Sequence, residues 1–413
     1  MRTSDLRSVL SRSDRRPLVL IVGGCDVHLR LDLARELSSD FTVAVLGSSS
    51  ESRNRFMDAD IQFGVYPLSR APNPAADLHS TVRLFQLFRR LRPDIVHTFA
   101  TKPCVWGRIA AHWAQVPVIV GTLPGLGSLY ADNNGRTRFL RALYRPLQRT
   151  ACSVSDLTIF QNRDDALELI ATGMVQPAKA RVIPGSGVRT NFFDPALVSR
   201  EEREMIRREA NAGSGSVVFT MVSRVIRSKG ALEFANAARL VRERVPEAEF
   251  VLVGPDDREA RDHLKAEEVE YLRSSVRWLG PRDDVRAVLA ASDVFVLPSF
   301  YREGIPRVLL EAASMGLPII TTNSPGCVEV VEDDRNGILV APRDPGSLAE
   351  AIVRMAAAKD LRRRYGAASR DRAIRYFDLA VICAETAAAY HELLARAAPS
   401  VLRRLSSAAN APN

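Results

Sequence analysis

Residues 299–320 read SFYREGIPRVLLEAASMGLPII, and the architecture we expect follows from them. The residues directly before them, VFVLP at 294–298, form an apolar run of the kind that a strand buried on both faces requires. Pro306 suits the first turn of a helix, because its missing N–H would have no partner there. Gly316 and Pro318 end the helical pattern, and IITT at 319–322 predicts the next strand. The sequence therefore predicts a strand–turn–helix–strand unit of a parallel α/β sheet.

This unit contains two carboxylates, Glu303 in the turn and Glu311 in the helix. If the helix begins near Ile305, both can face the sheet edge at which open α/β proteins bind ligands. The first N–H groups of the helix can bind a phosphate at this edge, and a carboxylate can accept hydrogen bonds from sugar or ribose hydroxyls. Spacing alone favours a simpler interpretation, two solvated carboxylates on one face of a helix.

Three segments around the glutamates favour the ligand site. They resemble the E-x7-E motif of the family-4 retaining glycosyltransferases: EGIP at 303–306, LEA at 310–312 and GLP at 316–318. PGCVEVV at 325–331 and NGILV at 336–340 are also similar to that family. The resemblance implies an α/β protein of GT-B fold, with two Rossmann-like domains whose parallel sheets face each other across a cleft.

The chain has 413 residues, which is enough for two domains of about 200 residues, each with its own core. We expect a disordered basic leader at 1–16, an acceptor-side domain at 17–190 and a donor domain at 191–378. As in the family, a C-terminal helix at 379–397 is expected to return to the first domain. The residues that remain, 398–413, are expected to form a disordered tail.

Charge and cysteine content restrict the possible partners and compartment. Residues 1–190 carry 25 Lys and Arg against 16 Asp and Glu, whereas residues 191–413 carry 32 of each kind. The excess in the first half indicates an anionic partner: a membrane surface, a phosphorylated lipid or nucleic acid. No apolar run spans a bilayer, no signal peptide is recognisable, and five scattered cysteines suit reduced thiols, so we expect a cytoplasmic protein.

The second domain supplies most of the predicted donor site. Arg224 and Lys229 follow the apolar residues 217–222, and two cations five apart in such a loop can reach one diphosphate. The resemblance assigns them to the leaving diphosphate, Glu303 to the transferred sugar and Glu311 to the ribose. It also implies donor contacts at the helix start, beside the base and in the first glycine turn: Gly304, Ile305, Pro306, Arg307, Val308, Trp278, Leu279, Gly23 and Gly24.

In the first domain, Gly23 and Gly24 follow a strand at 18–22, but no G-x-G-x-x-G is present, which disfavours an NAD enzyme. His97 ends a predicted strand in a loop that resembles the histidine-bearing loop of the family, and is a candidate catalytic residue. Some members carry a second histidine two positions on, where this chain has Phe99. His97 is therefore either the active-site histidine or a structural neighbour. The acceptor-side candidates are Lys102, Gly125 and Gly127.

Residues 136–149 predict a basic amphipathic helix, with five arginines among five apolar side chains. One interpretation is that this helix lies on an anionic membrane, and the other is an ordinary packed helix with a solvated arginine face. The charge excess of the first half favours the membrane.

The combined prediction is a retaining glycosyltransferase that moves a sugar from a nucleotide-diphosphate donor to a lipid-linked glycan of the bacterial envelope. We expect the donor to be a UDP-sugar. REGIPR at 302–307 is most similar to members that build such glycans. The resemblance implies no metal and no cofactor, and the D-x-D string at Asp58 and Asp60 has no buried strand beside it. The alternatives are a nucleotide-sugar epimerase on the same fold, or a non-catalytic protein that binds polyanions or nucleotide sugars. No nucleic-acid-binding motif is recognisable.

Overall fold

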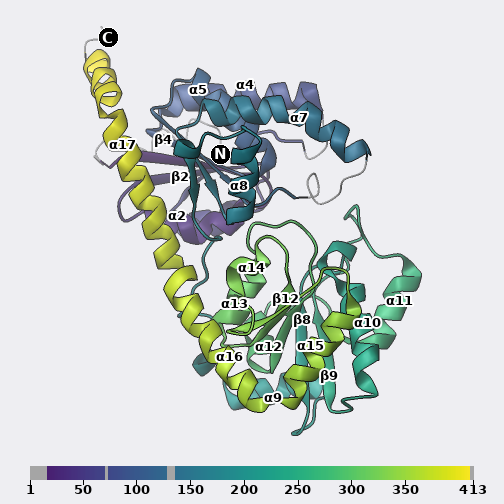
Figure 1. Cartoon of the computed structure of the whole chain (residues 1–413). Helices are drawn as coiled ribbons and strands as arrows, with labels where there is room; N and C mark the ends of the chain where they lie inside the picture. The colour runs from purple at the N-terminus through teal and green to yellow at the C-terminus, as the bar shows by residue number, and fades with distance from the viewer. Residues whose placement is uncertain (1–15, 70–72, 128–134, 410–413) are drawn as a thin grey trace. The chain divides into compact units, whose positions relative to one another are not determined.

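The computed structural model describes residues 16–69, 73–127 and 135–409, and the chain divides into two compact units (Figure 1). Unit 1 consists of Met1–Ser186 and Ile382–Asn413, and unit 2 is Gly187–Val381. The division after Ser186 lies four residues before the predicted boundary at 190. Of the expected leader at 1–16, only Arg16 is among the described residues.

The described part of unit 1 contains a parallel sheet of seven strands in the order β3-β2-β1-β4-β5-β6-β7. The strands are β1 (Leu18–Val22), β2 (Thr42–Gly47), β3 (Gln62–Val65), β4 (Ile95–Phe99), β5 (Val118–Leu123), β6 (Leu157–Phe160) and β7 (Ala180–Val182). Helices α2 (Leu31–Leu37), α4 (Pro74–Leu91), α5 (Arg108–Trp113), α7 (Gly135–Ser153) and α8 (Arg163–Ala171) connect them, together with the short α3 (Arg53–Met57) and the turns η1 (Val27–Arg30), η2 (Pro103–Gly107) and η3 (Pro177–Lys179).

Both faces of this sheet are covered by helices. Successive side chains of a strand point to opposite faces, so neighbouring residues of one strand pack in different clusters. Val19 and Ile21 of β1 pack in one cluster with side chains of α2 and of the C-terminal helix α17 (Leu379–Ala409). Leu20 and Val22 pack in another cluster with side chains of α4 and α5. A strand that is covered on both sides needs a continuous apolar sequence, and LVLIV supplies it.

Unit 2 contains a six-stranded parallel sheet in the order β10-β9-β8-β11-β12-β13. Its strands are β8 (Val217–Val222), β9 (Ala248–Val253), β10 (Arg277–Trp278), β11 (Val294–Leu297), β12 (Ile319–Thr322) and β13 (Gly337–Val340). Its helices are α9 (Arg200–Glu209), α10 (Ala231–Arg242), α11 (Ala266–Ser275), α12 (Val285–Ala290), α13 (Arg307–Ser314), α14 (Cys327–Val330), α15 (Pro345–Ala357) and α16 (Lys359–Arg372), with the turns η4 (Pro195–Leu197), η5 (Arg227–Lys229) and η6 (Ala373–Phe377).

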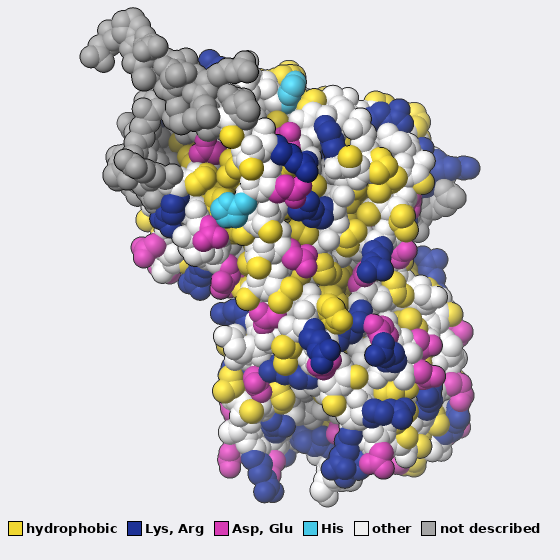
Figure 2. Space-filling view, turned by 60° about the vertical axis from the view of Figure 1, so that its left-hand side comes forward, with side chains coloured by type: hydrophobic (Ala, Val, Ile, Leu, Met, Phe, Trp, Pro, Cys, Tyr) yellow, Lys and Arg dark blue, Asp and Glu magenta, His cyan; other side chains and the backbone are white. Residues whose placement is uncertain are grey.

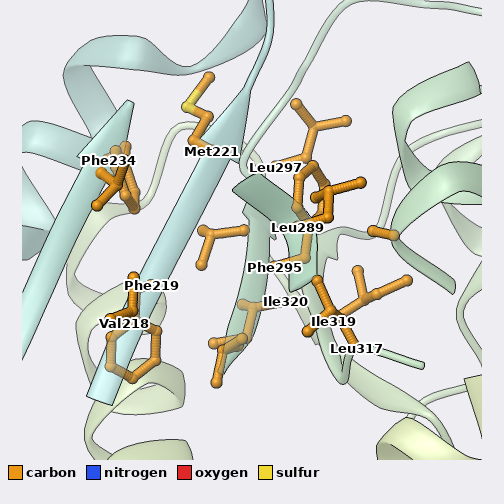
Figure 3. Close-up of a cluster of buried hydrophobic side chains, with 14 of the residues drawn as sticks. Val218, Phe219, Met221, Phe234, Leu289, Phe295, Leu297, Leu317, Ile319 and Ile320 are labelled. Carbon is orange, nitrogen blue, oxygen red and sulfur yellow. The ribbon is translucent and has the colours of Figure 1, made fainter. Parts of the chain in front are cut away.

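The core of unit 2 is centred on β8 and β11, the two strands in the middle of its sheet. Figure 3 shows Phe219 of β8, Phe295 of β11 and Ile320 of β12 among the apolar side chains that fill this layer. All three are fully buried. The strand–turn–helix–strand unit predicted from residues 294–322 is therefore β11, α13 and β12, at the centre of the sheet.

Two predicted element boundaries need correction. Helix α13 begins at Arg307 and not near Ile305, because Pro306 has an extended ψ of 116° and precedes the first helical residue. Helix α17 continues to Ala409, so most of the expected disordered tail at 398–413 is helical. Residues 410–413 lie outside the described part of the chain.

The surface in Figure 2 carries basic and acidic side chains mixed together, with apolar side chains between them. Among the described residues, no helix is both long enough and apolar enough to cross a bilayer.

Candidate functional site

A pocket of about 390 Å³ lies at the carboxyl end of the unit 2 sheet. The turns after β8 and β9, the turn after β10 and the start of α13 supply its walls. Because carboxyl ends of neighbouring parallel strands meet at one edge, residues distant in sequence come together there. Its ionisable lining residues are Arg224, Lys229, Arg282, Glu303, Arg307 and Glu311. The four residues on which the predicted donor site depends thus line one pocket.

Lys229 and Glu303 form an ion pair in this pocket, from Nζ to Oε1. The Lys229 side chain is 12% exposed and that of Glu303 20%, so solvent screens the pair only partly. The backbone brings the two turns together, because the N–H groups of Phe300 and Tyr301 donate to the Ser228 carbonyl at 2.9 and 3.1 Å. The pair therefore follows from how two strand ends are hydrogen-bonded to each other.

Two glycines allow these turns to approach so closely. Gly230 has φ 82°, and a Cβ there would lie 2.2 Å from the carbonyl oxygen of Pro298. Gly326 has φ 81°, and a Cβ there would lie 1.9 Å from the carbonyl oxygen of Gly304. Only glycine adopts this backbone conformation without strain and leaves room for the neighbouring carbonyl. Both positions hold the turns that present Lys229 and Glu303.

Arg224 lies at the more open side of the pocket. Its guanidinium donates from NH1 to Oδ2 of Asp257 at 2.7 Å, and its side chain is 53% exposed. Because the guanidinium is half solvated, its pair with Asp257 costs little to exchange for another anion. Arg224 and Lys229 are thus two cations from one loop in one pocket, as a diphosphate site requires.

Glu311 is held by Arg307, one helical turn earlier on α13. Arg307 Nε donates to Glu311 Oε1 at 3.1 Å, and the Glu311 side chain is only 15% exposed. Burial raises the pKa of Glu311, and the charge and the hydrogen bond of Arg307 lower it in part. Among the described residues, no group bonds the second carboxylate oxygen, Oε2.

Arg282 also lines the pocket, although no sequence motif indicated it. Its guanidinium contacts Asp284 through two nitrogens, at 2.7 and 2.6 Å, and also Glu209. These carboxylates raise the pKa of Arg282, and the guanidinium lowers that of Asp284. Arg282 therefore stays charged, but its positive charge is compensated by two carboxylates of its own unit. The cluster PRDD at 281–284 was the available signal.

Not all of the predicted donor residues line this pocket. Pro306 and Val308 do, whereas Gly304, Ile305, Trp278 and Leu279 are not among its lining residues. Ile305 is buried in the core, and Gly304 packs against Gly326.

Trp278 and Leu279 lie at the sheet edge, on β10 and directly after it. Trp278 Nε1 donates to the Gly254 carbonyl at 2.9 Å, and Arg273 lies over its ring at 4.4 Å. Both ring contacts hold the indole against the sheet. A base contact of these two residues stays a prediction.

His97, the candidate catalytic residue of unit 1, does not end its strand as predicted. Strand β4 continues through Thr98 to Phe99, so His97 lies inside the sheet and is 1% exposed. Its Nδ1 bonds the Tyr390 hydroxyl at 2.5 Å and its Nε2 the Thr122 hydroxyl at 2.7 Å. Burial, together with the positive charge of Arg108 and Arg30, lowers its pKa well below the usual value. His97 is therefore a neutral core side chain whose two nitrogens are already occupied.

The other unit 1 candidates lie after the carboxyl ends of its strands. The Gly23 carbonyl accepts from the Tyr66 hydroxyl at 2.9 Å, and Gly24 follows it in the same turn. Lys102 is paired with Asp77 at 2.6 Å, and Gly125 and Gly127 have φ values of 133° and 62°. Their assignment to donor or acceptor remains a prediction.

The amphipathic helix predicted at 136–149 is α7, which is somewhat longer than expected. Tyr144 and Leu147 pack against a small cluster formed by Val105, Ile109 and Ala151, so part of its apolar face is used within unit 1. Phe139, near the start of the helix, is 68% exposed. The side chains of Arg136, Leu140 and Leu143 lie outside the described part.

Two family models together cover most of the chain. Residues 216–358 match the model described as glycosyl transferases group 1, and residues 23–185 match that of the glycosyl transferase 4-like domain. The Arg224, Lys229, Glu303 and Glu311 pocket lies within the first match.

Curated relatives match over most of their length. UDP-Gal:alpha-D-GlcNAc-diphosphoundecaprenol alpha-1,3-galactosyltransferase of Escherichia coli is 33% identical over 323 residues, which cover 77% of this chain and 81% of that protein. N,N'-diacetylbacillosaminyl-diphospho-undecaprenol alpha-1,3-N-acetylgalactosaminyltransferase of Campylobacter jejuni is 29% identical over 333 residues, 80% of this chain and 86% of the relative.

Solved structures share the fold. A glycosyltransferase of Rickettsia africae superimposes with a TM-score of 0.75 at 21% identity, over 92% of this chain and 99% of that one. HepE of Anabaena, crystallised with UDP, gives a TM-score of 0.75 at 19% identity, over 91% of this chain and 100% of the other. The prediction of a GT-B fold with two Rossmann-like domains is confirmed. The chain belongs to the group 1 glycosyltransferases, the family-4 enzymes that its E-x7-E segment resembles, and it is a glycosyltransferase.

Proposed function

We propose that this enzyme transfers a hexose, with retention of configuration, from a UDP-sugar to an undecaprenyl-diphosphate-linked glycan in the synthesis of a bacterial envelope polysaccharide. The names of the Escherichia coli and Campylobacter jejuni relatives support this acceptor class, and the first also supports the UDP donor. The observation that carries the proposal is the pocket in which Arg224, Lys229, Glu303 and Glu311 meet.

Each of these residues has a distinct part in the proposed reaction. Arg224 and Lys229 bind the diphosphate, and the partial positive charge at the start of α13 adds to the positive potential there. Glu303 accepts a hydrogen bond from a hydroxyl of the transferred sugar, and Glu311 accepts from the ribose. Arranging this charge before the reaction lowers the barrier, because the leaving UDP gains negative charge as the bond breaks.

The bond changes balance without a protein nucleophile. The bond between the anomeric carbon and the β-phosphate oxygen breaks, and the acceptor oxygen bonds to the same face of that carbon. The proton of the acceptor hydroxyl passes to the leaving phosphate oxygen, and UDP departs. Lys229 thus supports the leaving group, while its partner Glu303 orients the sugar.

A transfer assay tests this proposal. Labelled UDP-galactose, UDP-glucose and their N-acetylated forms are each offered with a polyprenyl-diphosphate-linked sugar, and the product lipid is extracted. We expect one donor to label the lipid with an α linkage, and Glu303→Gln to lower kcat/KM by about 10- to 150-fold, the loss of a charged hydrogen bond. The control is Glu267→Gln, a carboxylate that is 77% exposed on α11.

Failure of every UDP-sugar to label the lipid contradicts the proposal. Conversion of a donor sugar in the absence of acceptor indicates the epimerase alternative. Binding without turnover indicates a non-catalytic protein.

We also propose that unit 1 binds the anionic inner surface of the plasma membrane through α7. The exposed Phe139 and the exposed arginines 138, 145 and 149 support this. Each basic group near an anionic surface contributes about 1 kcal/mol. We expect the protein to float with phosphatidylglycerol vesicles at moderate salt and not with neutral ones, and Arg138→Glu with Arg145→Glu to abolish flotation. Equal flotation of wild type and double variant contradicts this proposal.

A further inference from the structure

Arg307 is an unusual residue for the first position of helix α13. The unpaired N–H groups of a helix start carry partial positive charge, which favours an acidic residue and disfavours a cation. The first turn of α13 contains no acidic residue. The order Arg307 before Glu311 is also the less favourable orientation of an i, i+4 ion pair. Helix stability therefore does not explain Arg307, and conflicts of this kind concentrate at functional sites.

The contact between Arg307 and Glu311 lies inside the donor pocket. Both residues line it, and the guanidinium occupies only one carboxylate oxygen, Oε1, at 3.1 Å. Within the described part of the chain, no group bonds Oε2. The carboxylate is thus held at one oxygen and remains able to accept a hydrogen bond at the other.

We propose that Arg307 is a positioning residue that holds Glu311 ionised and oriented, so that Glu311 Oε2 accepts hydrogen bonds from the ribose hydroxyls of the donor. This inference rests on the proposed UDP-sugar donor. It identifies Arg307 as a residue on which recognition of the donor's nucleoside depends. Arg307 acts through Glu311 and not on the diphosphate, which Arg224 and Lys229 bind.

The charges around Glu311 support this role. The other basic residues that line the pocket are paired with carboxylates: Lys229 with Glu303, Arg224 with Asp257, and Arg282 with Asp284 and Glu209. Arg307 is the cation in contact with the Glu311 carboxylate. Burial opposes the charged form of Glu311, and Arg307 opposes that effect. Without Arg307 the pKa of Glu311 would be higher, so the carboxylate would be protonated over a wider range of pH. The Glu311 side chain would also lose the hydrogen bond that holds its orientation.

The test compares UDP with 2′,3′-dideoxy-UDP in calorimetric titrations of the full-length enzyme. We expect the wild type to bind UDP about 10- to 100-fold more tightly, the value of charged hydrogen bonds to the ribose. Arg307→Gln should reduce this ratio to less than about 3-fold, with little change for the dideoxy nucleotide, and Arg307→Lys should restore most of it. The control is Arg200→Gln, which removes an i, i+4 pair of the same order with Glu204 on α9.

A pH series separates positioning from a general structural effect. In Arg307→Gln the preference for UDP should increase with pH more strongly than in the wild type, because Arg307 no longer lowers the pKa of Glu311 and the carboxylate ionises only at higher pH. A structural defect would not recover in this way.

Three results overturn the inference while the donor proposal stands: equal weakening of both nucleotides by Arg307→Gln, no change in either, or a wild type that does not discriminate between them. Equal weakening would place Arg307 on the diphosphate. If the wild type binds neither nucleotide, the donor proposal itself is wrong, and this inference falls with it.

Discussion

At the scale of single residues, Lys229 and Glu303 place opposite charges side by side in this pocket. The two form an ion pair with each other, and each has a different partner in the proposed complex, the diphosphate for Lys229 and a sugar hydroxyl for Glu303. A ligand that offers only an anion would draw Lys229 away from Glu303 and give that carboxylate no new hydrogen bond, which costs free energy in a partly buried site. The pocket is therefore matched to a molecule that carries both groups.

Removal of Lys229 tests this pairing. Lys229→Ala leaves a mostly buried carboxylate without its cation and the leaving diphosphate without one of its charges. We expect kcat/KM to fall about 100- to 1,000-fold and the free energy of unfolding to fall by about 1–3 kcal/mol. The control is Lys265→Ala, because the Lys265 side chain is 71% exposed, and it should change the free energy of unfolding by less than about 0.5 kcal/mol. Equal kinetics in the two variants would show that Lys229 has no part in transfer.

His97 gives a prediction on stability instead of catalysis. Its pKa in the folded protein lies well below the 6.5 of a free histidine, so below that pH the unfolded chain binds more protons. The free energy of unfolding should therefore be at its full value above pH 6.5 and decrease as pH falls below it. His97→Gln should flatten this slope and leave kcat of the folded enzyme within about 3-fold. A folded His97→Gln enzyme with transfer reduced a hundredfold would return His97 to the active site.

At the scale of elements, the turns after β8 and β11 and the loop before α14 form one packed group. Gly326 is central to it, since its α-carbon lies against the Glu303–Gly304 turn. Gly326→Ala would require both a strained φ and displacement of that turn, so we expect a loss of at least about 2 kcal/mol of stability and a raised donor KM. Gly215→Ala, where a Cβ meets nothing within 4 Å, is the control. An unchanged donor KM in Gly326→Ala would mean that the turn is not positioned by this contact.

Helix α17 is the other element with a clear structural task, because from Ile382 onward it belongs to unit 1. Its Tyr390 is fully buried and bonds His97, and Leu393 packs in the same cluster. Tyr390→Phe would leave His97 Nδ1 without a partner in the core, at a cost of about 1–3 kcal/mol. Thermal unfolding should show the loss, whereas Tyr376→Phe, at a tyrosine 52% exposed, should not. Equal melting temperatures would mean that the hydroxyl contributes nothing.

At the scale of the whole molecule, the sequence predicted what apolar runs and motif spacing determine. The strand at 18–22 and the one at 319–322 have the predicted bounds, because runs such as LVLIV fit only a doubly covered strand. The pocket residues of unit 2 were found because the E-x7-E segment and the Arg224–Lys229 loop are local patterns.

Residues that act through distant partners were beyond such reasoning. The position of His97 depends on Tyr390, 293 residues later, and no local pattern reports that contact. The pair of Asp257 with Arg224 and that of Arg282 with Glu209 join residues that are distant in the sequence, so they form only in the fold. The i, i+4 spacing of Arg307 and Glu311 was enough to predict that they pair on one helix. The spacing does not show that this pair lies in a pocket.

The central claim is that one pocket of unit 2 binds the diphosphate of a UDP-sugar through Arg224 and Lys229. Calorimetric titration of UDP into the wild type and into the double variant Arg224→Ala, Lys229→Ala tests it most directly. We predict one site per chain in the wild type and an affinity at least about 100-fold weaker in the double variant, since two charged hydrogen bonds are lost. Equal affinity in both proteins, or no binding by the wild type, would contradict the claim.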